Sequence, residues 1–246
     1  MMSELVPFKD KYKNEKIVLF APGPTLNDFS YELYPQLKNI KTCGINGVIL
    51  DDRFIDILDF WIWSGDIDIP QHPQPQYHFI MEKIKYINKK TTKLVNCWVD
   101  NNIKNKGILW DVQTQLHPET AKEMGFIRYN QVVRNIPQDY YYKDLSTIKS
   151  GVCIDTCAFH ALQILLYMGF NDVVLVGFDC GGNHSFKKNE KYEKDVCDWN
   201  TSENSNALVE YWKQFKSWLN KNYLNVNISV INPIGLRNVF KNYLNT

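Results

Sequence analysis

Short apolar stretches alternate with polar, turn-forming stretches along the chain. The first, Lys16 to Ala21, is rich in β-branched and aromatic residues and ends at Pro22-Gly23-Pro24. Two similar stretches follow, Ile40 to Ile45 and Ile57 to Trp63, each ending in small and polar residues. A strand, a turn and a helix in repetition are typical of a parallel sheet, and Pro24 suits the first turn of a helix predicted over Thr25 to Leu37.

The last hundred residues show the same rhythm. A helix is predicted to open at Ser150-Gly151 and to end before Gly169, which suits the position just after a helix. Val173 to Phe178 is continuously apolar, as a strand buried on both faces of a parallel sheet is. The remaining predicted elements are an amphipathic helix over Ala207 to Leu219, a strand over Val226 to Asn232 and a helix over Leu236 to Leu244.

The middle of the chain is harder to assign. Gln71 to Gln76 holds two prolines, and Lys93 to Val99 is the clearest strand candidate. We interpret residues 67–140 as an irregular, loop-rich insertion or cap over the sheet edge. The predicted fold class is therefore α/β, a single Rossmann-like nucleotide-binding domain over residues 1–246 with a mainly parallel sheet.

Charge and composition argue against nucleic acid as a partner, against a transmembrane helix and against a zinc site. The 246 residues carry a net charge of +1, so no basic field draws the protein to nucleic acid. The apolar stretches are too short for a transmembrane helix, and the polar N-terminus has no signal-peptide pattern, so we expect a cytoplasmic protein. The six cysteines are scattered and form no CxxC pair, which favours buried thiols over a zinc site.

Polar clusters follow the predicted strands. Ligands of open parallel sheets bind beyond the carboxyl ends of the strands, and helix N-termini there attract phosphate groups. The pattern predicts a phosphate-bearing ligand, and a nucleotide is the form we expect. The clusters are Gly23-Pro24-Thr25, Asn46-Gly47, Ser64-Gly65-Asp66, Asp179 with Gly181 to Ser185, Asn232-Pro233 and the helix start at Ser150-Gly151.

None of these clusters is a standard phosphate motif. The turn APGPTL matches neither GxGxxG nor a P-loop, and Asn46-Gly47 is equally consistent with plain turn chemistry. Asp179 is more suggestive, because a buried strand delivers it to the functional edge. His184 lies at the same edge and is the candidate general acid or base, whereas His160 is expected to be a core histidine.

Several stretches resemble known proteins, in matching order. KIVLFAPGPTLNDF resembles the first strand and turn of the glycosyltransferase family 42 bacterial sialyltransferases, which carry Gly-Pro-Ser-Leu there. KTCGINGVI resembles their second strand, with a nucleotide-contacting Asn at Asn46. IKSGVCIDTCAFHALQILLYMGFNDVVLVGFD and VINPIGLRNVF resemble later segments, and residues 67–140 have no counterpart. The first motif is also similar to the 6-hydroxymethylpterin diphosphokinase MptE-like family and to motility-accessory, flagellin-glycosylating proteins.

The resemblance implies a fold, a donor and a reaction. The family transfers a nonulosonic acid from a CMP-sugar to a glycan hydroxyl with inversion, without a metal and with a His as base. This chain departs from the family because DWNTSEN lacks that His, the helper Arg before Ser-Gly is missing near Thr147, and Cys180 replaces a tyrosine. The resemblance and the polar clusters at the strand ends together predict a donor pocket, with these donor-binding residues: Gly23, Pro24, Thr25, Asn46, Ser64, Ser150, Gly151, Asp179 and Asn183.

The predicted function is therefore a nucleotide-dependent transferase, a glycosyltransferase with a CMP-sugar or another nucleotide-sugar donor and an unknown glycan or small-molecule acceptor. Asp66 or His184 would deprotonate the acceptor, no cofactor would be required, and a homo-oligomer is possible. One alternative is an MptE-like diphosphokinase that uses ATP and Mg²⁺, with Asp66, Asp68 and Asp179 as candidate metal ligands. Another is a non-catalytic nucleotide-binding module.

Overall fold

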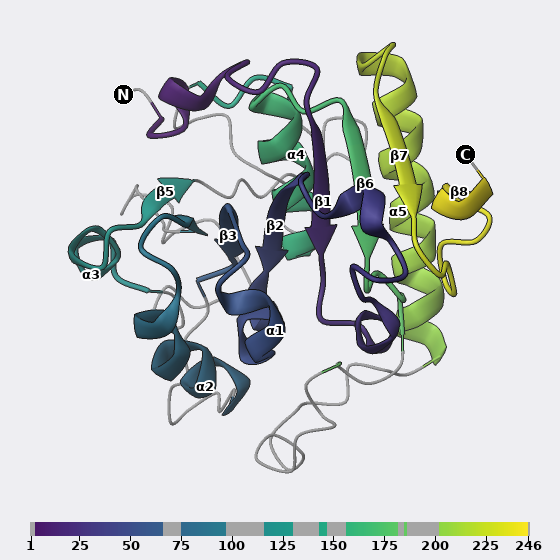
Figure 1. Cartoon of the computed structure of the whole chain (residues 1–246). Helices are drawn as coiled ribbons and strands as arrows, with labels where there is room; N and C mark the ends of the chain where they lie inside the picture. Colours follow the sequence, from purple (N-terminus) through teal and green to yellow (C-terminus); the bar gives the residue numbers. More distant parts are fainter. Residues whose placement is uncertain are drawn as a thin grey trace.

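The computed structural model contains one eight-stranded sheet in which every neighbouring pair of strands is parallel (Figure 1). It describes residues 3–65, 75–96, 116–129, 143–146, 156–181, 185 and 202–245. The strands are β1 (Lys16–Phe20), β2 (Lys41–Ile45), β3 (Phe60–Trp63), β4 (Thr92–Asn96), β5 (Ile127–Tyr129), β6 (Asp172–Val176), β7 (Asn227–Val230) and β8 (Lys241–Asn242).

The helices are α1 (Asp52–Ile55), α2 (Pro75–Lys83), α3 (Pro118–Glu123), α4 (Cys157–Tyr167) and α5 (Ser202–Asn222). Short 3₁₀ helices are η1 (Val6–Phe8), η2 (Pro24–Asp28), η3 (Pro35–Leu37), η4 (Asn46–Leu50), η5 (Ile84–Tyr86) and η11 (Tyr243–Asn245). The spatial order of the strands is β5-β4-β3-β2-β1-β6-β7-β8. The α/β class and the parallel sheet are therefore as predicted.

Alternate residues of the central strand face two separate cores. Ile17 and Leu19 of β1 pack with residues of α4 and α5, whereas Val18 and Phe20 pack with residues of α1, α2 and α3. All these β1 side chains are fully buried, because helices cover both faces of the sheet. Figure 1 shows α4 near the middle of the sheet, by β1 and β2, and α5 along β6 and β7. With both faces covered, the ends of the strands are where a ligand can reach the sheet.

Residues 67–140 contribute to the sheet, which corrects the interpretation of this segment as an irregular insertion. In the described parts of the segment, β4 pairs with β3 and β5 pairs with β4, both in parallel. Their inward side chains, Leu94, Val95 and Tyr129, are buried. The strand candidate Lys93 to Val99 overlaps β4, whereas β5 is too short to give a periodic signal and its conformation depends on pairing with β4.

Two predicted helices are absent. The segment predicted to be helical over Thr25 to Leu37 holds only η2 and η3, because Phe29 is extended and Pro35 cannot continue a helix. The segment predicted to be helical over Leu236 to Leu244 turns back and forms β8 instead. Lys241 pairs with Ser229 of β7, so hydrogen bonding to an open strand edge outweighs a modest helix propensity.

The helix predicted from Ser150-Gly151 begins later. Its described part, α4, starts at Cys157, and the preceding Thr156 is extended, with φ −147° and ψ 155°. A continuous helix cannot pass through that conformation, and Ser150 and Gly151 lie outside the described residues. The helix ends as predicted, with Gly169 in the left-handed region at φ +100°.

Candidate functional site

The chain changes direction between β1 and β6. It runs outward from β1 through β2, β3, β4 and β5, and then returns to place β6 on the other side of β1. The connections that follow β1 lie on the face of α1 and α2, while α5, which follows β6, lies on the opposite face. The connections that leave the two strands therefore run to opposite faces of the sheet, and ligands of such sheets bind in the crevice outside the carboxyl ends of the strands at this switch point.

A buried carboxylate ties the two turns of this crevice together. Asp179, after β6, accepts hydrogen bonds from the backbone N–H of Thr25 at 2.8 Å and from its hydroxyl at 2.6 Å. Both side chains are buried. Burial raises the pKa of Asp179 above its ordinary value of 3.8, and the nearby charge of Asp28 adds to this rise, while the hydrogen bonds from Thr25 lower the pKa. Asp179 thus fixes the conformation of the Gly23–Thr25 turn.

Two glycines allow the turns to approach so closely. A Cβ on Gly177 would lie 2.1 Å from the carbonyl oxygen of Ala21, and Gly177 itself has φ +77°. A Cβ on Gly23 would lie 2.2 Å from the carbonyl oxygen of Gly177 and 2.5 Å from the carboxylate of Asp179. The backbone N–H of Gly23 donates to the carbonyl of Gly177 at 3.0 Å. Only glycine fits at either position without a backbone shift.

This packing corrects one expectation about phosphate binding. The Gly23–Thr25 turn was expected to offer exposed helix amides, but Thr25 donates its N–H to Asp179 and Leu26 donates its own to Gly23. Pro24 has no N–H at all. The start of η2 therefore has few donors left for a phosphate, and an adjacent carboxylate opposes one.

Asn46 and Ser64 come together at the ends of β2 and β3. The Oδ1 of Asn46 accepts from the backbone N–H of Ser64 at 3.0 Å, and its carbonyl accepts from the indole N–H of Trp61 at 3.0 Å. Asn46 has φ +42°, an uncommon backbone conformation that Asn tolerates better than most residues. Within the described part of the chain its Nδ2 donates to no other residue. That amide is available to a ligand.

The N-terminus of α4 lies at the same edge. The thiol of Cys157 donates to the carbonyl of Ile62 in β3 at 3.5 Å, two residues before Ser64. The hydroxyl oxygen of Thr156, the residue that precedes the helix, is buried, and it has no hydrogen-bond partner among the described residues. Buried polar atoms usually have partners, so this hydroxyl is a candidate ligand contact that the sequence did not reveal.

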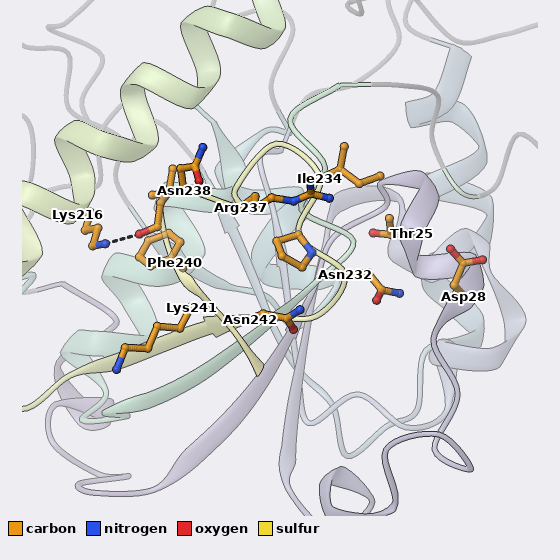
Figure 2. A pocket seen from close by; sticks show the side chains of 12 residues that line it. Thr25, Asp28, Lys216, Asn232, Ile234, Arg237, Asn238, Phe240, Lys241 and Asn242 are labelled. Atoms are coloured by element: carbon orange, nitrogen blue, oxygen red, sulfur yellow. Dashed lines mark hydrogen bonds between the residues drawn. The ribbon is translucent and has the colours of Figure 1, made fainter. Parts of the chain in front are cut away.

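A cleft of about 780 Å³ opens on the β7 side of the crevice (Figure 2). Ligand pockets commonly range from about 300 to 1,000 Å³. Thr25 and Asp28 form one wall, and residues from the loop after β7 form the other. Asn232 follows β7 with φ +48°. Of the predicted donor residues the cleft includes Thr25, while Asn46, Ser64 and Asp179 do not line it.

The predicted site residues divide into three groups. Gly23, Pro24, Thr25 and Asp179 converge at the switch point, and Asn46 and Ser64 meet each other at the ends of neighbouring strands. The predicted catalytic residues Asp66 and His184 lie outside the described residues, as do Ser150, Gly151 and Asn183. The sequence pattern did not single out Asp28, Thr156 or Arg237, whose polar side chains carry no motif.

Buried histidine and cysteine side chains at this end of the sheet are structural. His160 of α4 is buried, and its Nδ1 lies 3.1 Å from the hydroxyl of Tyr129, as expected for a core histidine. Burial and the neighbouring Asp179 raise the pKa of the Cys180 thiol to about 12, so it is protonated near neutral pH and is no nucleophile. The described residues contain no group of three His, Cys, Asp or Glu side chains placed to hold a metal ion.

Comparisons with known proteins add one structural likeness. The sequence matches no protein-family model, and no curated protein matches it. Among solved structures, the chain is similar to the sialyltransferase CstII from Campylobacter jejuni in complex with a substrate analogue, cytidine-5'-monophosphate. The two are 12% identical with a TM-score of 0.44, over 93% of this chain and 84% of that chain. A likeness at this level assigns neither a ligand nor a reaction.

No helix within the described ranges is both long enough and apolar enough to cross a membrane.

Proposed function

We propose that the protein is a nucleotide-dependent transferase, a glycosyltransferase that takes a sugar from a CMP-sugar or another nucleotide-sugar donor. The observation that carries the proposal is the arrangement at the β1/β6 switch point. There, Asp179 locks the turn that holds Thr25, and the free amide of Asn46 stands at the end of the next strand. Polar groups held rigidly at this edge are the usual framework of a nucleotide site in parallel sheets.

Each described residue has a distinct role in the proposal. The Nδ2 of Asn46 donates to an oxygen of the nucleoside, since its Oδ1 is already held by Ser64. Asp179 is a positioning residue, because both its oxygens accept from Thr25. The phosphate lies near the start of α4, where the helix dipole favours negative charge and the hydroxyl of Thr156 lacks a partner.

The donor class rests on the sequence. Gly23-Pro24-Thr25-Leu26, Asn46 and Gly177-Phe178-Asp179 occur in the order seen in the family 42 sialyltransferases that they resemble. In the reaction, an acceptor oxygen forms a bond to the anomeric carbon while the bond from that carbon to the phosphate oxygen breaks. The acceptor proton passes to a base, for which Asp66 and His184 remain the predicted candidates. Orientation of the two substrates and stabilisation of the leaving phosphate supply the rate enhancement.

A thermal-shift screen tests the proposal without knowledge of the acceptor. Any ligand that binds the native state raises its stability by mass action. We expect CMP to raise the melting temperature equally with Mg²⁺ and with EDTA, and to do so more than UMP, GMP, ATP or GTP. No shift with any nucleotide would reject the donor site, and a shift only with ATP and Mg²⁺ would reject the glycosyltransferase.

A matched pair of variants locates the binding. Asn46→Ala removes the amide that we assign to the nucleoside and should abolish the CMP shift. Asn14→Ala is the control, because Asn14 also has a positive φ of +66° but lies at the opposite edge, where it accepts from Asn171. Both variants place Ala in a strained conformation, so both should lower stability. Only Asn46→Ala should also lose the CMP shift, which separates loss of binding from loss of stability.

A further inference from the structure

The cleft beside the switch point has two unlike walls. One wall comes from the turn after β1 and presents Thr25 and Asp28. The other comes from the loop and short strand that follow β7, with Lys216 of α5 at its end. Figure 2 shows Arg237 and Asn232 on the second wall, on the side that faces Thr25 and Asp28. A ligand in this cleft would lie next to the proposed nucleotide site, since Thr25 belongs to both.

The cleft is more basic than the chain as a whole. Its lining holds the cations Lys216, Arg237 and Lys241 against one carboxylate, Asp28. Lys216 is partly committed, because its Nζ donates to the carbonyl of Val239. Arg237 is exposed, and within the described residues its guanidinium makes no hydrogen bond or ion pair. A guanidinium fork matches the oxygens of a carboxylate or a phosphate, so Arg237 is the best placed cation for an anionic ligand.

The other polar groups suit hydroxyls. Asn232, Asn238 and the carboxylate of Asp28 line the same space. An amide both donates and accepts hydrogen bonds, and a carboxylate accepts them, so together they can bind the alternating donors and acceptors of a polyol. The one carboxylate also keeps the cleft from being a purely cationic surface. The lining therefore favours a ligand with hydroxyl groups and one anionic group.

The wall that carries Arg237 is held in shape. The backbone N–H groups of Val239 and Phe240 both donate to the carbonyl of Leu236, and Lys216 anchors the loop to α5. Gly235 packs against the turn after β6 so closely that a Cβ there would lie 2.5 Å from the carbonyl oxygen of Asp179. The loop is thus continuous with the switch point, and a preorganised wall loses little entropy when a ligand binds.

We propose that this cleft is the acceptor site of the transferase, and that the acceptor is a polyhydroxylated compound bearing a phosphate or a carboxylate that Arg237 binds. The inference rests on the proposed function, because it takes the neighbouring site to hold the nucleotide donor. It goes further by giving the acceptor a charge and by assigning the residue that recognises it. Asp28 and Asn232 bind the hydroxyls of the same molecule.

Calorimetric titrations of the whole chain with defined probes test this proposal. The probes are glucose 6-phosphate, glucuronate, neutral glucose and inorganic phosphate, each with and without saturating CMP. We expect at least one sugar anion to bind about ten-fold more tightly than glucose and than inorganic phosphate, because a charge-assisted pair and the hydroxyl contacts each add affinity. Preference between glucose 6-phosphate and glucuronate identifies the anionic group as phosphate or carboxylate.

Two charge-removing variants locate the binding. Arg237→Gln should weaken the sugar anion about ten-fold, to the level of glucose, because the fork is lost. Lys221→Gln removes an equal charge from the last turn of α5, at a residue that does not line the cleft, and should leave binding unchanged. Arg237 is exposed, so neither variant is expected to unfold the protein. Equal affinities of wild type and Arg237→Gln would overturn the assignment of Arg237.

The CMP arm separates failure of this inference from failure of the proposed function. Binding of the sugar anion to the CMP-saturated protein supports an acceptor site. Competition between CMP and the sugar anion, with Arg237→Gln weakening CMP as well, would overturn it, because the cleft would then hold the nucleotide phosphate. If CMP binds and no sugar anion does, the acceptor inference fails alone. If CMP does not bind, the proposed function fails and the inference fails with it.

Discussion

The two sides of the carboxyl edge are built in opposite ways. At the β1/β6 switch point, the backbone and carboxylate groups pair with one another, and the glycines leave no space for a methyl group. In the cleft after β7, Arg237 is exposed and its guanidinium makes no hydrogen bond or ion pair within the described residues, and the side-chain amides of Asn232 and Asn238 line the open volume. At the switch point, the polar groups bond to one another and fix the turns. In the cleft, the polar groups remain available to a ligand.

The difference indicates how the site divides its work. Asp179 is buried, and each of its carboxylate oxygens already accepts a hydrogen bond from Thr25. We therefore interpret Asp179 as a brace, a residue that holds the turn after β1 in place, and not as a ligand contact. In our proposal, the ligand contacts are therefore made by groups that surround the turn fixed by Asp179. These are the amide of Asn46, the hydroxyl of Thr156 and the guanidinium of Arg237.

The largest expected loss of stability comes from adding a methyl group where the turns after β1 and β6 pack against each other. Gly177→Ala should lower the free energy of unfolding by about 3 kcal/mol, since it combines a left-handed alanine with a severe clash against Ala21. Gly125→Ala is the matched control, because Gly125 has φ +73° but open space around it, and should cost only about 1 kcal/mol. Urea denaturation measures both. Equal losses would show that the close approach at the switch point is not a constraint.

The brace itself is tested by Asp179→Asn. The amide oxygen can still accept from the backbone N–H of Thr25, and its Nδ2 can donate to the Thr25 hydroxyl, which then accepts. Two hydrogen bonds to a charged carboxylate are thus replaced by weaker neutral ones, so we expect a loss of about 1.5 kcal/mol. Asp172→Asn changes the same residue type at the other end of β6, where the carboxylate forms a partly exposed pair with Lys16. That control should cost less than about 1 kcal/mol. A smaller loss at Asp179 than at Asp172 would contradict the brace.

The pH dependence gives a third test of the brace. The pKa of Asp179 is raised in the folded protein, so between its ordinary value of 3.8 and the raised value the native state binds more protons than the unfolded state. Stability from this group is therefore complete below pH 3.8 and declines as the pH rises through the folded pKa. The stability of wild type relative to Asp179→Asn should fall from acid to neutral pH. A rise over that range would mean that the folded pKa is lowered instead.

Substitution of Thr156 is expected to change CMP affinity more than stability. Thr156→Val removes a buried hydroxyl without a described partner, so the free energy of unfolding should change by less than about 0.5 kcal/mol. CMP affinity should nevertheless fall several-fold, with cytidine unaffected. Thr91→Val is the control, because its hydroxyl donates to Leu58 at 2.7 Å and its loss should cost about 1 kcal/mol without any effect on CMP. Unchanged CMP affinity in Thr156→Val would remove the hydroxyl from the site.

The sequence predicted the central strands of the sheet better than the connecting segments and the edge strand β8. Continuously apolar strands such as β1 and β6 predicted a buried parallel sheet, and Asp179 follows β6 at the carboxyl end of the sheet, as its place in the sequence indicated. The helix over Thr25 to Leu37 was wrong, because local patterns do not reveal how Phe29 packs. The strand β8 was missed for a related reason, since its conformation depends on the open edge of β7.

The site was only partly predictable for the same physical reason. Asn46 and Ser64 stand directly after strands, so a rule about strand ends finds them. We assign Thr156 and Arg237 to the proposed site because of where tertiary packing of distant segments places them, and a single sequence gives no signal for such packing. The role of Asp179 as a brace also required the distances to Thr25.

Hydrogen exchange measured with and without CMP, in EDTA, tests the central claim most directly. If the nucleotide binds at the switch point, the segments around residues 21–28, 44–48 and 62–65 should exchange more slowly, while residues 10–14 at the opposite edge should not change. Because exchange reports local opening, binding is located without a variant that might unfold. Protection confined to residues 232–242, or to the opposite edge, would contradict the account.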